Sequence, residues 1–124
     1  KPLANSDANE VKLPMVTLTN ASTASASELF VAALRDYEKT QVVGTTTYGK
    51  GVVQTTYSLK DGSGIKFTTA KFNPPKSENY NGVGIKPDYE VTLTVEQEKN
   101  LDNLDENTDP QLKKAVEVAN SLHQ

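Results

Sequence analysis

Two short segments of the chain hold residue types that could carry out acyl transfer. Residues 23–28 read Thr-Ala-Ser-Ala-Ser-Glu, and residues 48–54 read Tyr-Gly-Lys-Gly-Val-Val-Gln. A serine hydroxyl becomes an effective nucleophile when a base takes its proton, and that base is usually an imidazole. The only histidine is His123, next to the last residue, and terminal residues are usually frayed. The two segments therefore predict a serine hydrolase in which lysine replaces histidine as the base.

Lysine acts as a base only in an unusual environment. A free lysine has a pKa near 10.4, and lowering it to about 7 costs roughly 4.6 kcal/mol, which burial can supply. The neighbours Tyr48, Gly49, Gly51 and Val52 carry no carboxylate that would favour the ammonium form. A glutamine at position 54 can accept a hydrogen bond from the amine without adding a negative charge. Gln54 is therefore a candidate for orienting the lysine.

Apolar periodicity predicts the elements that position the serine segment. A β-branched run at residues 15–19 predicts a strand, and a polar turn and an apolar-periodic helix from about 27 to 39 follow it. Ser25 then lies where a helix begins, and the N–H of Ala26 points to where an oxyanion would form. Glu28 in the first turn suits the positive end of the helix dipole, and we interpret it as a structural residue.

The lysine segment is expected to open a β-hairpin. Residues 41–44 form a second short strand, and the β-rich runs 51–60 and 64–72 flank an Asp-Gly turn signal. Side chains alternate along a strand, so Lys50, Val52 and Gln54 would share one face.

The last third of the chain predicts a loop, a strand and a helix. Turn formers fill residues 74–88, and a strand is expected at 89–93. The mostly acidic residues 96–109 predict a solvated surface connection. Asp109 as N-cap and Pro110 at the first helical position predict an amphipathic C-terminal helix. Its apolar stripe consists of Leu112, Ala115, Val116, Ala119 and Leu122.

The composition of the chain limits the classes of protein to which it can belong. The chain has 124 residues, enough for one domain, and its 35% hydrophobic content is lean. A net charge of −3 with scattered basic residues argues against nucleic-acid binding. The absence of cysteine from the sequence excludes disulfides and thiolate zinc sites, and we expect neither a metal nor a cofactor. No run approaches the roughly 20 apolar residues of a membrane span, and none has the pattern of a signal peptide, from which nothing follows about targeting.

The serine and lysine segments, with their surroundings, resemble the carboxyl-terminal processing peptidases, the tail-specific serine proteases of family S41 with a Ser/Lys dyad. The resemblance implies Ser25 as nucleophile, Lys50 as general base and Gln54 as the residue that orients the lysine, with the Ala26 N–H as an oxyanion donor. It extends over roughly residues 14–120, through the matching stretches 14–20, 42–44, 61–72, 82–88 and 109–112.

The chain departs from the family pattern in two ways. Thr23 stands where serine is common, at a position that is not the nucleophile. An R-x-N-x-G-G segment of the oxyanion hole and a PDZ domain, both expected upstream of the nucleophile, do not precede Ser25. We therefore expect this chain to be the C-terminal part of a larger protease.

The resemblance implies an α/β fold, a mixed β-sheet with flanking helices, forming the crotonase- and ClpP-like part of a tail-specific protease core. We divide the chain into a polar N-terminal loop (1–13), part of the catalytic domain (14–95), and an acidic connection with a C-terminal helix packing on the core (96–124). The implied substrates are proteins or peptides with nonpolar C-terminal tails. The implied location is the bacterial cell envelope, periplasmic or membrane-anchored. A homodimer is a further expectation, because uncovered sheet edges and apolar helix faces tend to find partners.

Two other functions remain open at this point. Residues 44–51, Gly-Thr-Thr-Thr-Tyr-Gly-Lys-Gly, nearly match the phosphate loop of nucleotide-binding proteins. However, Gly51 replaces the Ser or Thr that would hold magnesium, and a strand pattern follows where a helix is required. The second possibility is a non-catalytic binding or docking module with an inactive dyad, because a fold does not by itself imply an activity.

Overall fold

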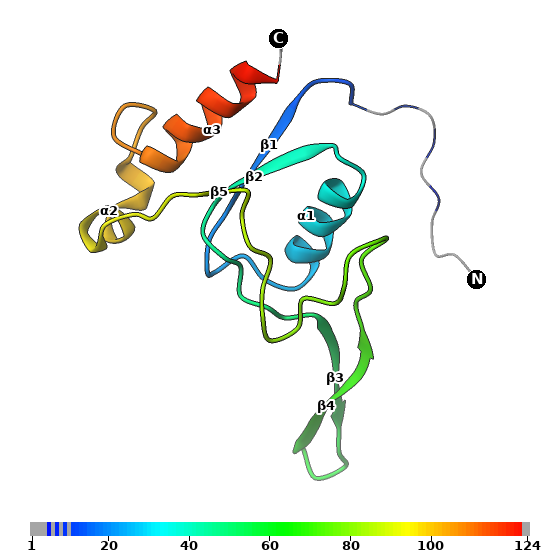
Figure 1. The fold of residues 1–124 in the computed structure, drawn as a ribbon. Helices are drawn as coiled ribbons and strands as arrows, with labels where there is room; N and C mark the ends of the chain where they lie inside the picture. Colours follow the sequence, from blue (N-terminus) through cyan, green and yellow to red (C-terminus); the bar gives the residue numbers. More distant parts are fainter. Residues whose placement is uncertain (1–4, 6, 8, 10, 123–124) are drawn as a thin grey trace.

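The computed structural model describes residues 5, 7, 9 and 11–122 (Figure 1). His123 and most of the predicted polar loop at 1–13 lie outside the described residues. The elements follow in the order β1 (Met15–Thr19), α1 (Ala26–Asp36), β2 (Thr40–Gly44), β3 (Val52–Ser58), β4 (Gly64–Lys71), β5 (Tyr89–Glu90), α2 (Val95–Lys99), a 3₁₀ turn η1 (Leu101–Asn103) and α3 (Pro110–Ser121).

A parallel sheet with a helix on each face forms the core. Its strands lie in the order β1-β2-β5, and α1 is the crossover that connects β1 to its parallel neighbour β2. The consecutive residues Val42 and Val43 on β2 are fully buried and face opposite sides. Val42 packs with residues of α1, and Val43 packs with Ala115 and Val118 of α3. This arrangement places the start of α1 beside the end of β1.

The antiparallel strands β3 and β4 form a separate hairpin that extends away from the core (Figure 1). The expected mixture of parallel and antiparallel strand pairs is present, but the parallel pairs and the antiparallel pair lie in two separate sheets. Tyr57 and Phe67 stack on one face with ring centroids 5.1 Å apart, and both remain about half exposed. Two-stranded sheets gain little stability alone, so this hairpin depends on its attachment to the core just after Lys50.

The structure confirms β1, α1, β2, the hairpin and α3 as types of element, and it differs from the sequence expectation in two places. The strand expected at 89–93 is reduced to the two residues of β5. The expected acidic connection contains the short helix α2, because the Thr94 hydroxyl oxygen accepts a hydrogen bond from the Gln97 N–H, and the Gln97 side-chain oxygen accepts one from the Thr94 N–H. This reciprocal capping satisfies helix N–H groups that a plain connection would leave to water.

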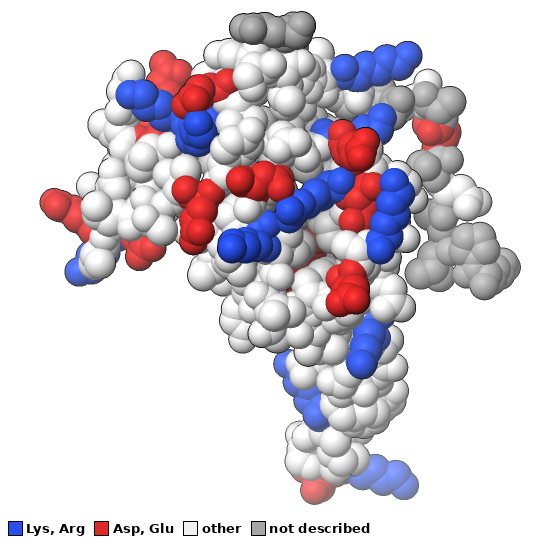
Figure 2. Space-filling view, in the orientation of Figure 1, with Lys and Arg blue, Asp and Glu red and all other residues white. Residues whose placement is uncertain are grey.

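Charged side chains of both signs are interspersed on the face shown in Figure 2. Among the helices described within residues 11–122, none has the length and apolar character needed to cross a bilayer.

Candidate active site

Ser25 has a backbone conformation that is rare for a residue with a side chain. It is the N-cap of α1, with φ 59° and ψ −118°. Positive φ in a non-glycine residue costs on the order of 1–3 kcal/mol and is retained only where surrounding contacts enforce it. Such residues cluster at functional sites, so the backbone itself marks Ser25 as a candidate.

Three hydrogen bonds enforce this conformation. The Ser25 N–H donates to Glu28 Oε2 at 2.9 Å. The Ser25 carbonyl accepts from the Leu29 N–H at 3.1 Å and from the Tyr80 hydroxyl at 3.2 Å. The peptide groups on both sides of Ser25 are therefore held by groups of the fold.

Glu28 joins the serine segment to the lysine segment. Its side chain is fully buried and accepts hydrogen bonds from the Thr47 hydroxyl, the Gly49 N–H at 2.7 Å and the Lys50 N–H at 2.8 Å. Its Oε2 atom accepts from both Ser25 and Lys50, so these two backbone nitrogens cannot lie farther apart than the two bonds together. One carboxylate thus brings together the two residues that the sequence selected for chemistry.

The hydrogen bonds to Glu28 also determine its charge. Burial alone would raise the pKa of Glu28, but the bonds from Thr47, Lys50, Gly49 and Ser25 outweigh burial and hold the pKa below its usual value. The group is therefore an ionised carboxylate at neutral pH. Backbone N–H groups of Ser25, Gly49 and Lys50 stabilise its negative charge. Because these donors belong to both segments, Glu28 links the two segments rigidly.

Residues 82–85 hold the lysine segment in place through two hydrogen bonds. The Ile85 N–H donates to Thr47 Oγ1 at 2.7 Å, and the Gly82 N–H donates to the Gly49 carbonyl at 2.8 Å. Gly49 has φ 87°, and a Cβ there would lie 2.8 Å from the Gly84 nitrogen. Glycine is required at this position because the two backbones touch.

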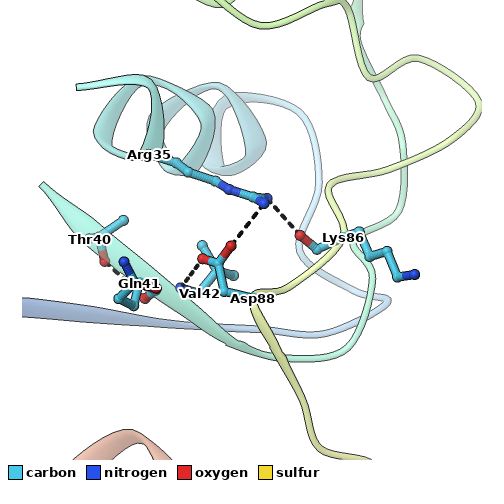
Figure 3. Close-up of polar contacts among 6 residues, drawn as sticks. All are labelled: Arg35, Thr40, Gln41, Val42, Lys86 and Asp88. Carbon is cyan, nitrogen blue, oxygen red and sulfur yellow. Dashed lines mark hydrogen bonds and ion pairs between the residues drawn. The ribbon is translucent and has the colours of Figure 1, made fainter. Parts of the chain in front are cut away.

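The stretch at 86–88 is anchored to α1 and β2 (Figure 3). Asp88 forms an ion pair with Arg35 at 2.8 Å and accepts a hydrogen bond from the Val42 N–H at 2.8 Å. The Arg35 guanidinium also donates to the Lys86 carbonyl at 2.7 Å. These contacts give the stretch 82–88, Gly-Val-Gly-Ile-Lys-Pro-Asp, a structural role: it fixes the loop that contacts the lysine segment.

The predicted site residues fall in three environments. Ser25 and Lys50 are partly buried, and the backbone N–H groups of both donate to Glu28 Oε2. Ala26 is the exposed first residue of α1. Gln54 is exposed on β3. Lys50 precedes the start of β3 at Val52, so the expected strand alternation does not extend to it.

The orienting role of Gln54 stays a prediction. Among residues 11–122, no hydrogen bond joins Gln54 to Lys50. The structure therefore brings the serine and lysine segments together through their backbones and leaves the glutamine on the adjoining strand.

Sequence reasoning missed the linking role of Glu28 and gave Tyr80 no role. Glu28 was interpreted as a residue of the helix start, and it does contact the N-cap as that interpretation requires. Its other partners lie 19 to 22 positions away, where periodicity carries no signal. Within residues 11–122, no three acidic or histidine side chains gather where they could hold a metal ion.

Residues 44–51 do not have the architecture of a phosphate loop. The strand β2 ends at Gly44, and the segment after Lys50 continues into the strand β3. A phosphate loop would lead into a helix whose N-terminus binds the phosphates.

Comparison with known proteins identifies similar chains. A family model described as Peptidase family S41 matches residues 2–91. A probable CtpA-like serine protease of Staphylococcus haemolyticus is 45% identical over 89 residues, which cover 71% of this chain and 18% of that protein. The chain thus spans about a fifth of the length of this curated relative.

Two solved structures are also similar. The photosystem II D1 C-terminal processing protease matches with a TM-score of 0.58 and 40% identity, over 64% of this chain and 20% of that one. A putative S41 protease from Bacteroides fragilis matches with a TM-score of 0.64 over 86% of this chain and 28% of that one, and its 21% identity bears on the fold alone.

Proposed function

The chain belongs to peptidase family S41, and from this premise we propose that it is the part of a serine endopeptidase that carries a Ser25/Lys50 dyad. The observation that carries the proposal is the fully buried Glu28, which accepts hydrogen bonds from the backbones of both residues. The chain covers about a fifth of a curated relative, so we propose that it acts within a longer polypeptide. There an upstream segment completes the oxyanion hole and a PDZ domain binds the substrate.

The proposed reaction is acyl transfer through a covalent intermediate. The neutral amine of Lys50 takes the proton from the Ser25 hydroxyl as the oxygen attacks the substrate carbonyl carbon. The carbonyl π electrons move to its oxygen, and the Ala26 N–H donates to this oxyanion. The protonated Lys50 then gives its proton to the leaving amine as the peptide bond breaks. Water, activated by Lys50 in the same way, hydrolyses the acyl-enzyme and regenerates Ser25.

Substrate class and location follow from the resemblance. We propose protein or peptide substrates with nonpolar C-terminal tails, in agreement with the name of the D1 C-terminal processing protease, which matches this chain. We also propose that the protein is located in the bacterial cell envelope and that it forms a homodimer.

The nucleophile is tested by replacing Ser25 with alanine in the full-length protein. We expect cleavage of a peptide with a nonpolar C-terminal tail to fall to the background rate, because no other group would form the acyl-enzyme. The measurement is turnover of an internally quenched peptide. The control is Ser58→Ala, an exposed serine at the end of β3, which should retain activity. Cleavage that survives Ser25→Ala would exclude Ser25 as the nucleophile.

The orienting role of Gln54 predicts a smaller effect. We expect Gln54→Ala to lower kcat by about tenfold, because the lysine amine would lose one hydrogen bond and keep its base function. Steady-state kinetics with the same peptide measure this. Thr56→Ala is the matched control, because Thr56 is exposed two residues further along β3. A loss as large as that of a Lys50 variant would assign Gln54 a more direct part in the reaction, and an unchanged kcat would remove it from the mechanism.

A further inference from the structure

Tyr80 is the one tyrosine of the described residues that is buried in the core. Its side chain is 4% exposed and packs with apolar residues of α1, β2 and the loop before β5: Val31, Ala32, Val42 and Ile85. A phenylalanine would fill the same apolar space. The feature that needs a reason is therefore the hydroxyl, which donates to the Ser25 carbonyl at 3.2 Å.

The Ser25 carbonyl and the Ala26 N–H belong to one peptide group. That group is planar and trans, so its C=O and N–H point in opposite directions. Any contact that fixes the direction of the Ser25 carbonyl also fixes the direction of the Ala26 N–H. The carbonyl has two donors, the Leu29 N–H at 3.1 Å and the Tyr80 hydroxyl.

This peptide group needs such support because it is held in an unfavourable orientation. A residue with φ near +60° normally has ψ of about +30 to +60°. Ser25 has φ 59° and ψ −118°, so the peptide after it is rotated by roughly half a turn from the relaxed orientation. The Leu29 N–H is part of the first turn of α1, and Tyr80 is a second donor that comes from a distant loop.

The Ala26 N–H that this orientation presents is available. Ala26 is exposed at the start of α1, and none of the residues that the structure describes accepts a hydrogen bond from its N–H. It lines a surface groove together with Ser27 and Phe30 of the same helix. The Ala26 N–H can therefore donate a hydrogen bond to a substrate oxygen that binds at the start of α1.

We propose that Tyr80 is a positioning residue for the reaction: its hydroxyl holds the Ser25–Ala26 peptide so that the Ala26 N–H points at the developing oxyanion. This inference rests on the proposed function. It gives Tyr80 a part in transition-state stabilisation without any contact with the substrate. An effect of this kind appears in kcat and leaves substrate binding unchanged.

The environment of Tyr80 favours the protonated hydroxyl that this contact requires. Burial and the nearby negative charge of Glu28 raise the pKa of Tyr80 above its ordinary value. Tyr80 therefore keeps its donor proton to a higher pH than an ordinary tyrosine does.

The test compares Tyr80→Phe with the wild type in the full-length protein. The matched control is Tyr89→Phe, which removes a tyrosine hydroxyl from a partly exposed ring on β5 that lies beside Lys114. Four quantities are measured: kcat and KM for a quenched peptide, the inhibition constant of a peptide aldehyde whose adduct places an oxyanion at the Ala26 N–H, and the affinity of the corresponding product peptide. The product affinity reports ground-state binding.

We expect Tyr80→Phe to lower kcat about tenfold and to weaken aldehyde inhibition by a similar factor, with KM and product affinity unchanged. Tyr89→Phe should match the wild type in all four quantities. An active wild type with kcat and aldehyde inhibition unaffected by Tyr80→Phe would overturn this inference alone. Equal losses of product affinity and aldehyde affinity would also overturn it, because they indicate general damage to the site. A wild-type protein that neither cleaves the peptide nor binds the aldehyde would overturn the proposed function and this inference with it.

Discussion

Lys50→Ala is expected to abolish peptide cleavage by the full-length protein while leaving its fold intact. Loss of the general base removes the only group proposed to take the Ser25 proton, and we expect kcat to fall by about four orders of magnitude. The fold should survive because Glu28 is bound by the backbone N–H of Lys50, which alanine retains. Quenched-peptide turnover measures the first effect, and the melting temperature measures the second.

Two variants make this prediction specific to the amine. Lys50→Arg keeps a long side chain and the backbone bond to Glu28, but a guanidinium is always protonated and cannot act as the base, so it should be equally inactive. Lys60→Ala changes an exposed lysine of the hairpin and should leave turnover unchanged. Appreciable turnover by Lys50→Ala or Lys50→Arg would remove Lys50 from the mechanism.

Glu28→Ala is expected to impair both stability and activity. It would leave the N–H groups of Ser25, Gly49 and Lys50 and the Thr47 hydroxyl without their acceptor. Each buried donor without a partner costs about 1–3 kcal/mol, so we expect a loss of at least about 3 kcal/mol of stability. Peptide cleavage should fall to background, because nothing would then hold the Ser25 and Lys50 backbones together.

The isosteric Glu28→Gln separates charge from shape. Glutamine has one acceptor oxygen, so its amide NH₂ would face two of the four donors, and we expect a large part of the same loss. Because the pKa of Glu28 is lowered in the folded state, its stabilising contribution is complete above its ordinary value of 4.5 and is lost as the pH falls through the lower folded value. Glu28→Gln should therefore lose stability at neutral pH and show a weaker decline toward acid than the wild type.

The melting temperature of the wild type, Glu28→Gln and Glu28→Ala, recorded from neutral pH to below the ordinary carboxyl pKa, measures these effects. Glu96→Gln is the matched control because Glu96 is exposed at the start of α2. A Glu28→Gln variant as stable and as active as the wild type would show that the carboxylate does not hold the two segments together.

Local pattern was sufficient to predict most of the fold. The β-branched run of β1 and the apolar spacing of α1 carry strong periodic signals, and Asp109 and Pro110 mark the start of α3 at the observed residue. The helix α2 was missed although Thr94 and Gln97 form a recognisable capping pair, because acidic composition was given more weight than capping.

The site was only partly predictable because its geometry depends on contacts that are distant in sequence. Residue types and resemblance identified Ser25 and Lys50 as candidates, but no periodicity could show that both backbones bind Glu28. Tyr80 lies 55 positions from the carbonyl to which it donates. The strained φ of Ser25 is likewise invisible in the sequence, where a serine before a helix predicts an ordinary cap.

The most direct measurement is fluorophosphonate labelling of the full-length protein, with the modified residue mapped by mass spectrometry in the wild type, Ser25→Ala and Lys50→Ala. We expect a label on Ser25, formed as the Lys50 amine takes the proton of the Ser25 hydroxyl. We also expect no label in Ser25→Ala and a greatly slowed reaction in Lys50→Ala. A label on another serine, or labelling of Ser25 at an unchanged rate in Lys50→Ala, would contradict a Ser25/Lys50 dyad.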